Sequence, residues 1–152
     1  KISYDKCLEE LTSIGEKVTF GDDLSDLALR KLGEKFDKFY FIVDWPLSLK
    51  PFYIHEKESN TSLSKSFDLQ FGHLELVSGG TRQHDASKLK SRLADQGLST
   101  ENFKDHLRVF EWGMPPHSGC GLGFDRLMMV LLGLNNIREA VLYPRDTSRI
   151  SP

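Results

Sequence analysis

The sequence predicts an α+β fold, in which helices and an antiparallel hairpin are mixed without a repeating βαβ order. One observation is that Ser66–Phe71 alternates strictly between polar and apolar residues, and that Leu74–Ser78 follows after Gly72-His73. This pattern is typical of two strands joined by a two-residue turn. The other is that segments with helical apolar spacing lie on both sides of this hairpin. The length of 152 residues suits one domain.

Five helices are expected where apolar side chains recur every three or four residues and a glycine or proline follows. They run from the capping residue Ser3 to Gly15, from Ser25 to Leu32 before Gly33, from Asp85 to Gln96, from Thr100 toward Pro115-Pro116, and from Phe124 to Leu132 before Gly133.

Outside the hairpin, two apolar runs predict further strands. Phe39–Val43 is continuously apolar, which predicts a strand buried on both faces, and Ala140–Tyr143 predicts a short last strand. The segment Glu56–Lys65 is polar and has no periodicity, so it is expected to be a loop.

Composition excludes several classes of protein. The net charge is -2, from 20 basic and 22 acidic residues, so no overall basic field attracts nucleic acid. No apolar run approaches the roughly 18 residues that a membrane span needs. Cys7 and Cys120 lie far apart and form no CxxC pair, which favours reduced thiols in a cytoplasmic protein. The chain begins with Lys1 rather than Met, and we expect it to be part of a longer protein.

The predicted hairpin places two carboxylates on one face of the sheet. With Gly72-His73 as the turn, Gln70 lies opposite Glu75 and Asp68 lies opposite Val77, so Asp68, Gln70 and Glu75 share a face. Such a pair can hold a hard divalent cation, most plausibly Mg²⁺ with nucleotide phosphates. The alternative is a solvated face with no ligand, and the spacing leaves both open.

Two arginines follow glycine-rich segments. Arg82 comes after Gly79-Gly80, where a ligand can approach the backbone, and a guanidinium binds a carboxylate through two parallel hydrogen bonds. The alternative is an ordinary surface arginine. Arg126 follows the alternate glycines of "GCGLGFDR". This run is neither a P-loop nor a dinucleotide fingerprint, but it offers flat backbone to a base or phosphate. Arg126 is interpreted as binding a phosphate or pairing with an acid; adjacent Asp125 points elsewhere on a helix.

These segments resemble a known family. "GCGLGFDRL" and its apolar helix resemble motif 3 of the class II aminoacyl-tRNA synthetases, and "SFDLQFGHLELVSGGTRQHD" resembles a segment of aspartyl-tRNA synthetases. "SYDKCLEEL", "DWPLSLKPFY" and the end of the chain from "MPPHSGC" to "SRISP" are similar to the archaeal and eukaryotic cytosolic type. The resemblance covers residues 1–152 and implies the C-terminal portion of a catalytic domain. Motif 3 is present, whereas motifs 1 and 2 and the anticodon-binding domain are not.

The resemblance implies a role for each matching residue, and no residue is expected to be a chemical catalyst. It implies ATP contacts by Glu75, Gly123, Phe124, Asp125 and Arg126, Mg²⁺ ligation by Glu75, Ser78 and Asp68, and binding of L-aspartate by Ser78 and Arg82. His84 and Asp85 match the end of the same motif. Strict alternation would put Ser78 on the face opposite Glu75, so a shared metal requires an irregularity, which we expect at Gly79-Gly80.

The function implied is that of an aspartate–tRNA ligase, which activates L-aspartate with ATP to aspartyl-adenylate and transfers it to tRNA(Asp). The full-length enzyme is expected to be a cytoplasmic homodimer with Mg²⁺, and the isolated chain is expected to be inactive. Gly79-Gly80 before the arginine is also similar to asparaginyl enzymes, so an asparaginyl-tRNA synthetase or an asparagine synthetase-like ligase is one alternative. A non-catalytic paralogue is another. "RQHD" and "PRDTSRISP" favour aspartate, and the complete set of site residues argues against a paralogue.

Overall fold

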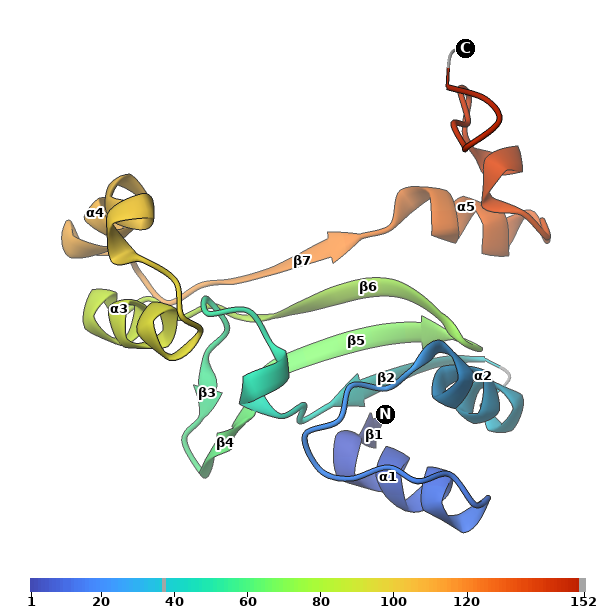
Figure 1. Ribbon diagram of the computed structural model, residues 1–152, viewed down its shortest axis with the longest axis horizontal. Helices are drawn as coiled ribbons and strands as arrows, with labels where there is room; N and C mark the ends of the chain where they lie inside the picture. The colour runs from blue at the N-terminus through green and yellow to red at the C-terminus, as the bar shows by residue number, and fades with distance from the viewer. Residues whose placement is uncertain (37, 151–152) are drawn as a thin grey trace.

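The structure is a computed structural model that describes residues 1–36 and 38–150 (Figure 1). The predicted domain, residues 1–152, ends at Ser151-Pro152, and so does the C-terminal segment that carries the family resemblance. These two residues lie outside the described residues. The centre is a five-stranded sheet in the order β1-β2-β5-β6-β7, antiparallel except for the β1–β2 pair. Its strands are β1 (Ile2–Ser3), β2 (Phe39–Val43), β5 (Ser66–Phe71), β6 (Leu74–Thr81) and β7 (Ser118–Leu122). The predicted α+β class and the central hairpin are confirmed.

The first two helices begin at the predicted caps. Helix α1 (Tyr4–Ser13) and helix α2 (Asp26–Lys35) each have a serine whose hydroxyl accepts a backbone N–H of the first turn. Gly33, however, does not stop α2, which continues to Lys35. A Cβ at Gly33 would lie 2.6 Å from the carbonyl carbon of Gly72. This glycine therefore lets the helix approach the β5–β6 turn closely, and its meaning in the sequence is packing rather than termination.

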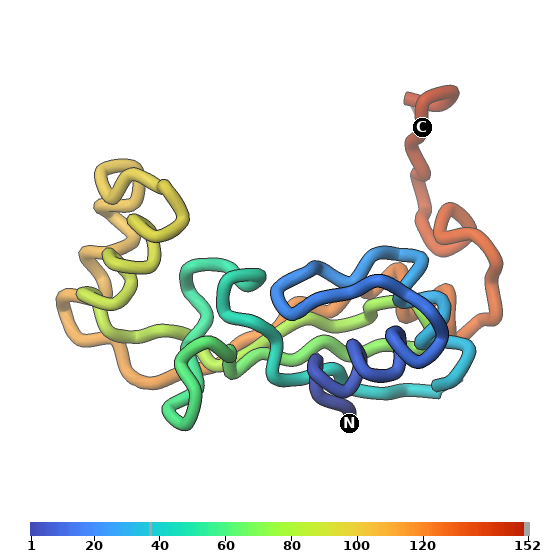
Figure 2. The backbone as a smooth tube through the Cα atoms, turned by 60° about the horizontal axis from the view of Figure 1, so that its bottom comes forward, coloured from blue at the N-terminus to red at the C-terminus, as the bar shows by residue number. Residues whose placement is uncertain are grey.

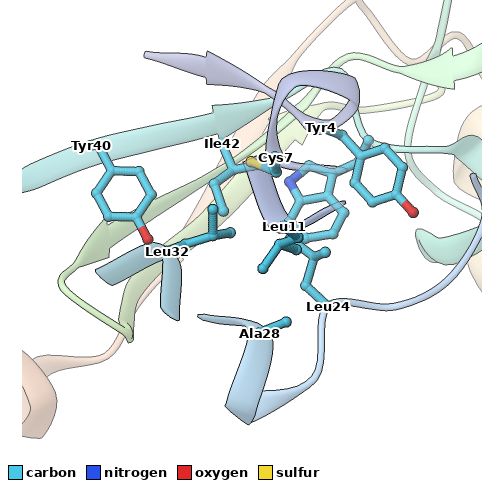
Figure 3. Packing of buried hydrophobic residues seen from close by; sticks show 9 residues of the cluster. Tyr4, Cys7, Leu11, Leu24, Ala28, Leu32, Tyr40 and Ile42 are labelled. Atoms are coloured by element: carbon cyan, nitrogen blue, oxygen red, sulfur yellow. The ribbon is translucent and has the colours of Figure 1, made fainter. Parts of the chain in front are cut away.

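The main core lies between the sheet and these two helices, as Figure 3 shows. It contains fully or almost fully buried side chains from α1, α2 and β2, among them Tyr4, Cys7, Leu11, Leu32 and Ile42. Burying each large aliphatic or aromatic side chain of this kind stabilises the fold by about 1.5–3 kcal/mol. This core fixes β2, and through its pairing with β5 it fixes the strand that carries Asp68.

The strand β2 is buried on one face only, so the prediction of two-sided burial is wrong. Tyr40 and Ile42 face the core, whereas Phe39 and Phe41 are 53% and 42% exposed. Phe39 packs against Phe71 of β5, with ring centres 4.8 Å apart. The continuous apolar run thus reflects cross-strand aromatic pairs on the second face, a pattern that periodicity alone does not separate from two-sided burial.

The segment predicted as a loop forms a small hairpin. Strand β3 (Glu56–Lys57) pairs with β4 (Asn60–Ser64) in a separate two-stranded sheet. Backbone bonds tie this hairpin to its surroundings, because Ser64 N–H donates to the Trp45 carbonyl. These strands are held by backbone hydrogen bonds rather than by a buried apolar face. The sequence therefore shows no apolar alternation that would have predicted them.

A helical unit lies at one end of the sheet and the last helix lies toward the other end (Figures 1 and 2). The unit contains α3 (Ala86–Asp95) and α4 (Lys104–Glu111). A 3₁₀ turn, Thr100–Phe103, lies between the two helices and leads into α4. Its own small core consists of Leu89, Leu93, Leu107 and Phe110. Helix α5 (Phe124–Leu131) ends before Gly133, which has a φ of +64°. The predicted helices are confirmed here to within a turn.

The predicted last strand, Ala140–Tyr143, is wrong. A 3₁₀ turn, η3 (Ile137–Ala140), ends there, and the apolar side chains of Leu142 and Tyr143 are 83% and 59% exposed. A short apolar run becomes a strand only beside an edge that accepts its backbone bonds, and no strand of the described residues pairs with it. Another short 3₁₀ turn, η1 (Leu47–Leu49), leads into Lys50. Within the described ranges, no helix is long and apolar enough to cross a membrane.

Candidate functional site

A bulge in β6 brings Glu75 and Ser78 onto the same face of the sheet. Glu75 pairs with Gln70, but Val77 pairs with Leu69, so Leu76 has no partner on β5. The extra residue reverses the alternation, and Ser78 now lies opposite Asp68. The predicted shared face of Asp68, Gln70 and Glu75 is confirmed. The predicted pairing of Asp68 with Val77 is wrong by one residue, because the irregularity lies at Leu76 and not at Gly79-Gly80.

Asp68 is the buried centre of a small polar network. Its carboxylate is 3% exposed and accepts a hydrogen bond from Ser78 Oγ at 2.6 Å. The other oxygen accepts from Lys50 Nζ at 2.8 Å, and this ammonium lies 4.1 Å from the centre of the Trp45 ring. Buried charges need such partners. Lys50 was not identified from the sequence, since a lone lysine before Pro51 carries no pattern and its partner lies 18 residues away.

Glu75 lies beside this network with its charge less well compensated. Burial and the Asp68 carboxylate raise the pKa of Glu75, and the opposing influence of Lys50 and Arg126 is smaller. The oxygen donors of Glu75, Ser78 and Asp68 are those that Mg²⁺ prefers, and a cation would relieve the charge that raises this pKa. These residues therefore fit the metal that the resemblance implies. No trio of His, Cys, Asp or Glu side chains in the described residues could complete a metal site alone.

Arg82 lies at the end of β6 over the start of β7. Its backbone N–H donates to the His117 carbonyl at 2.9 Å, and its guanidinium lies 4.7 Å from the centre of the Tyr53 ring. Within residues 1–36 and 38–150, no carboxylate forms an ion pair with Arg82. Lys50, by contrast, is neutralised by Asp68. The net positive charge in this part of the site therefore belongs to Arg82.

The first two alternate glycines, Gly119 and Gly121, lie in strand β7, an element that was not predicted from the sequence. Gly119 pairs with Gly80 and Gly121 pairs with Ser78, so both present their missing side chains on the face of Ser78. A Cβ at Gly121 would meet no atom within 4 Å, whereas a Cβ at Gly119 would lie 3.1 Å from Arg82 Nη2. The strand is thus a bare floor from Arg82 toward Arg126, roughly 13 Å for four residues.

Arg126 reaches from the first turn of α5 back to the bulge. Its Nη1 donates to the Glu75 carbonyl at 2.8 Å, and the Gly123 N–H donates to the Leu76 carbonyl at 2.8 Å. Arg126 is exposed and forms no ion pair with Asp125 among the described residues, as adjacent positions on a helix predict. The guanidinium therefore keeps most of its donors for an anion on the open side of the sheet.

The remaining predicted residues are Phe124 and Asp125, which precede Arg126, and His84 and Asp85, which follow Arg82. Phe124 is 63% exposed, and Asp125 is also exposed at the start of α5. His84 stacks on His55 with ring centres 5.9 Å apart. Asp85 caps α3 by accepting two backbone N–H groups, so its position in the motif has a structural reason.

A pocket of about 350 Å³ opens between the two strands and the segment after η1. Its lining includes Lys50, Tyr53, Ser78, Arg82 and Gly121. Tyr53, like Lys50, was not identified from the sequence. A larger groove of about 480 Å³ lies on the helical unit, but its charges pair with each other, as in Lys90–Glu111 and Lys104–Glu101. None of the predicted site residues lines that groove.

Comparison with known proteins shows which family the chain belongs to. The sequence model of the tRNA synthetases class II (D, K and N) matches residues 1–147. The chain is 47% identical over 152 residues to the aspartate–tRNA(Asp) ligase of Thermoplasma acidophilum, and 47% identical to the aspartate–tRNA(Asp/Asn) ligase of Archaeoglobus fulgidus. All of this chain aligns in both, and it spans 36% and 35% of the length of those relatives.

Solved structures show the same relationship. The asparaginyl-tRNA synthetase of Pyrococcus horikoshii superimposes with a TM-score of 0.93 at 35% identity, over 99% of this chain and 36% of that one. The aspartyl-tRNA synthetase of Entamoeba histolytica superimposes with a TM-score of 0.92 at 34% identity, over 99% of this chain and 32% of that one. The chain belongs to the class II tRNA synthetases of the D, K and N group.

Proposed function

We propose that this chain provides the aspartate-binding part and a portion of the ATP-binding part of an aspartate–tRNA ligase active site. The observation that carries the proposal is the charge of the pocket. Lys50 is neutralised by Asp68, and Arg82 remains as a cation without an acidic partner among the described residues. A guanidinium in this state suits a carboxylate ligand, which it can bind through two parallel hydrogen bonds.

The same observation favours aspartate over asparagine. A neutral amide would leave the charge of Arg82 uncompensated in a half-enclosed pocket, whereas a carboxylate neutralises it. The curated relatives that are 43–47% identical to this chain are aspartate–tRNA ligases, which supports the same choice. The asparaginyl and asparagine synthetase-like alternatives, and the non-catalytic paralogue, are therefore not part of the proposal.

The reaction requires two substrates to be aligned on the glycine floor. An oxygen of the α-carboxylate of aspartate attacks the α-phosphorus of ATP. The bond from this phosphorus to the oxygen that bridges to the β-phosphate breaks, and pyrophosphate leaves with that electron pair. Arg82 would hold the side-chain carboxylate, Ser78 would lie close to the amino acid, and Arg126 would hold the outer phosphates. The chain then acts by orienting the reactants and stabilising charge rather than by proton transfer.

Three residues of the described chain would hold Mg²⁺, namely Glu75, Ser78 and Asp68. When bound with ATP, the ion would neutralise phosphate charge. The bulge at Leu76 is what places the Glu75 and Ser78 oxygens on one face. Asp68 already accepts the Ser78 hydroxyl and the Lys50 ammonium, and it would offer its remaining lone pairs to the ion.

We place this chain within a longer cytoplasmic, homodimeric protein that transfers aspartate to the 3′ end of tRNA. The resemblance assigns the groups that hold the α-phosphate to motif 2, which this chain does not contain. The isolated chain should therefore bind parts of the substrates weakly and should not form the adenylate.

Amino-acid-dependent ATP–pyrophosphate exchange tests the proposal. The full-length protein should support exchange with L-aspartate and far less with L-asparagine, and residues 1–152 alone should support neither. Exchange driven by asparagine in preference to aspartate would contradict the assigned substrate. Exchange by the isolated chain would contradict the proposed need for the remaining polypeptide.

A further inference from the structure

We propose that Tyr53 and Gly119 are positioning residues that hold the Arg82 guanidinium in place for the amino-acid carboxylate. The proposal rests on the proposed function, since aspartate is taken as the ligand of Arg82. Tyr53 would act through its ring face, and Gly119 would act through the absence of a side chain. Neither residue needs to touch the substrate for this role.

The geometry places the guanidinium beside two different surfaces. The Arg82 Cζ lies 4.7 Å from the centre of the Tyr53 ring, within the range of a cation–π contact. A Cβ built on Gly119 would lie 3.1 Å from Arg82 Nη2 and 3.2 Å from Arg82 Nε. The guanidinium thus occupies space that any other residue at position 119 would partly fill.

The restraint matters because the charge of Arg82 has no acidic partner in the described residues. An arginine side chain has about 2 kcal/mol of rotamer entropy, and an unrestrained one would lose it on binding. The backbone of Arg82 is fixed by the bond to the His117 carbonyl and by the bridge to Ile54, but those contacts do not orient its guanidinium. The Tyr53 ring and the Gly119 backbone, by contrast, lie against the guanidinium itself.

The three glycines of the run therefore have separable roles. Gly119 lies against Arg82, while Gly121, two ladder pairs further along β7 on the same face, opens onto empty space. Gly123 gives the backbone N–H that binds the Leu76 carbonyl at the start of α5. The sequence predicts a single floor for a base or phosphate in this run, whereas the contact with Arg82 puts its first glycine on the amino-acid side of the pocket.

A Gly119→Ala substitution should leave the fold intact. The atoms that a Cβ would meet belong to the flexible end of the Arg82 side chain, which can move, and no positive φ is required at this position. In ATP–pyrophosphate exchange by the full-length protein, G119A should raise the KM for aspartate about tenfold and leave the KM for ATP unchanged. Y53L should raise the aspartate KM about three- to tenfold, and Y53F, which keeps the ring face, should restore it.

A double-mutant cycle separates positioning of Arg82 from a general effect on the pocket. In a protein that carries Arg82→Gln, G119A should change the aspartate KM less than twofold, because the guanidinium on which it acts is absent. An effect of equal size in both backgrounds would overturn the proposal, as would equal rises in the KM values for aspartate and ATP.

A crystal structure of the full-length G119A protein gives a readout that does not depend on the substrate. The Arg82 guanidinium should move away from β7 by a few tenths of an ångström or change rotamer, with the strands unmoved. An unshifted guanidinium would overturn the positioning role even if the enzyme is impaired. Absence of aspartate-dependent exchange in the wild-type protein, together with a shifted guanidinium in G119A, would reject the proposed substrate and keep the restraint.

Discussion

Arg126 Nη1 donates a hydrogen bond to the backbone carbonyl of Glu75, 2.8 Å away, so the arginine of the last helix is anchored on the strand residue whose side chain shares a sheet face with Ser78. The neighbouring bond from Gly123 N–H to the Leu76 carbonyl ties the start of α5 to the same bulge. One irregularity of β6 therefore sets both the shared face of the oxygen donors and the position of the arginine.

Replacing Arg126 should weaken ATP binding selectively. Arg126→Ala removes a charged donor group, which contributes about 1.5–3 kcal/mol per hydrogen bond to a charged partner. The KM for ATP in pyrophosphate exchange should therefore rise by about one to two orders of magnitude, and the KM for aspartate should change little. Arg30→Ala, at an exposed position of α2 outside the predicted site, serves as the control and should leave both values within about twofold. A loss confined to the aspartate KM would contradict the assignment of Arg126 to ATP.

Breaking the Lys50–Asp68 pair should destabilise the fold. Lys50→Met leaves a buried carboxylate, 3% exposed, without its cation, and such a loss costs about 3–5 kcal/mol. Urea unfolding measures the change. The double substitution Lys50→Met with Asp68→Asn removes both charges and should recover most of the stability. If the single and double variants unfold at the same urea concentration, the buried charge is not the cause.

A methyl group at Gly33 should push α2 away from the hairpin turn. The Cβ of Gly33→Ala would lie 2.6 Å from backbone atoms of Gly72, which cannot move as a flexible side chain can. Overpacking of this kind costs about 1–3 kcal/mol despite the better helix propensity of alanine. Glu34→Ala, at the next and exposed helix position, is the matched control and should be neutral or slightly stabilising. Equal melting temperatures for the two variants would show that the β5–β6 turn at Gly72 shifts to accommodate the methyl group without loss of stability.

Alkaline pH should destabilise the protein through Cys7. Burial raises the pKa of this thiol to about 12, so the folded state keeps a proton that the unfolded chain loses near pH 8.5. The stabilisation is complete below that pH and declines above it, by about 1.4 kcal/mol per pH unit until the folded thiol titrates. Urea unfolding at pH 8 and pH 10 should show this decline, and Cys7→Ala should flatten it. An equal slope in the variant would assign the effect to other groups.

Much of the fold follows from local pattern, because the hairpin alternation and the helix caps are properties of adjacent residues. Ser3, Ser25 and Asp85 all cap helices where their position suggests. The failures concern what lies across the structure. Glycine commonly ends a helix, so Gly33 predicts a C-terminus there. Only its close approach to Gly72 shows that Gly33 serves packing instead. The exposed run ending at Tyr143 has strand propensity but no edge to join.

The site shows the same division between local pattern and tertiary context. The family resemblance implied roles for Glu75, Ser78, Arg82 and Arg126 because these residues lie in contiguous motif segments, and those roles stay predictions. The bulge at Leu76 was not located, since nothing in "LELVS" distinguishes a regular strand from one with an extra residue. Lys50 and Tyr53 were missed because their roles depend on Asp68 and Arg82, which are distant in sequence.

The most direct test of the account is the amino-acid selectivity of an Arg82→Gln variant of the full-length protein, measured by ATP–pyrophosphate exchange. If the Arg82 guanidinium selects the side-chain carboxylate, kcat/KM for aspartate should fall at least about 100-fold, as expected for loss of a bidentate charged contact. The value for asparagine should stay within a few-fold of the wild type, and so should the KM for ATP. A variant that still prefers aspartate by the wild-type ratio would contradict the central claim that the charge of Arg82 determines the substrate.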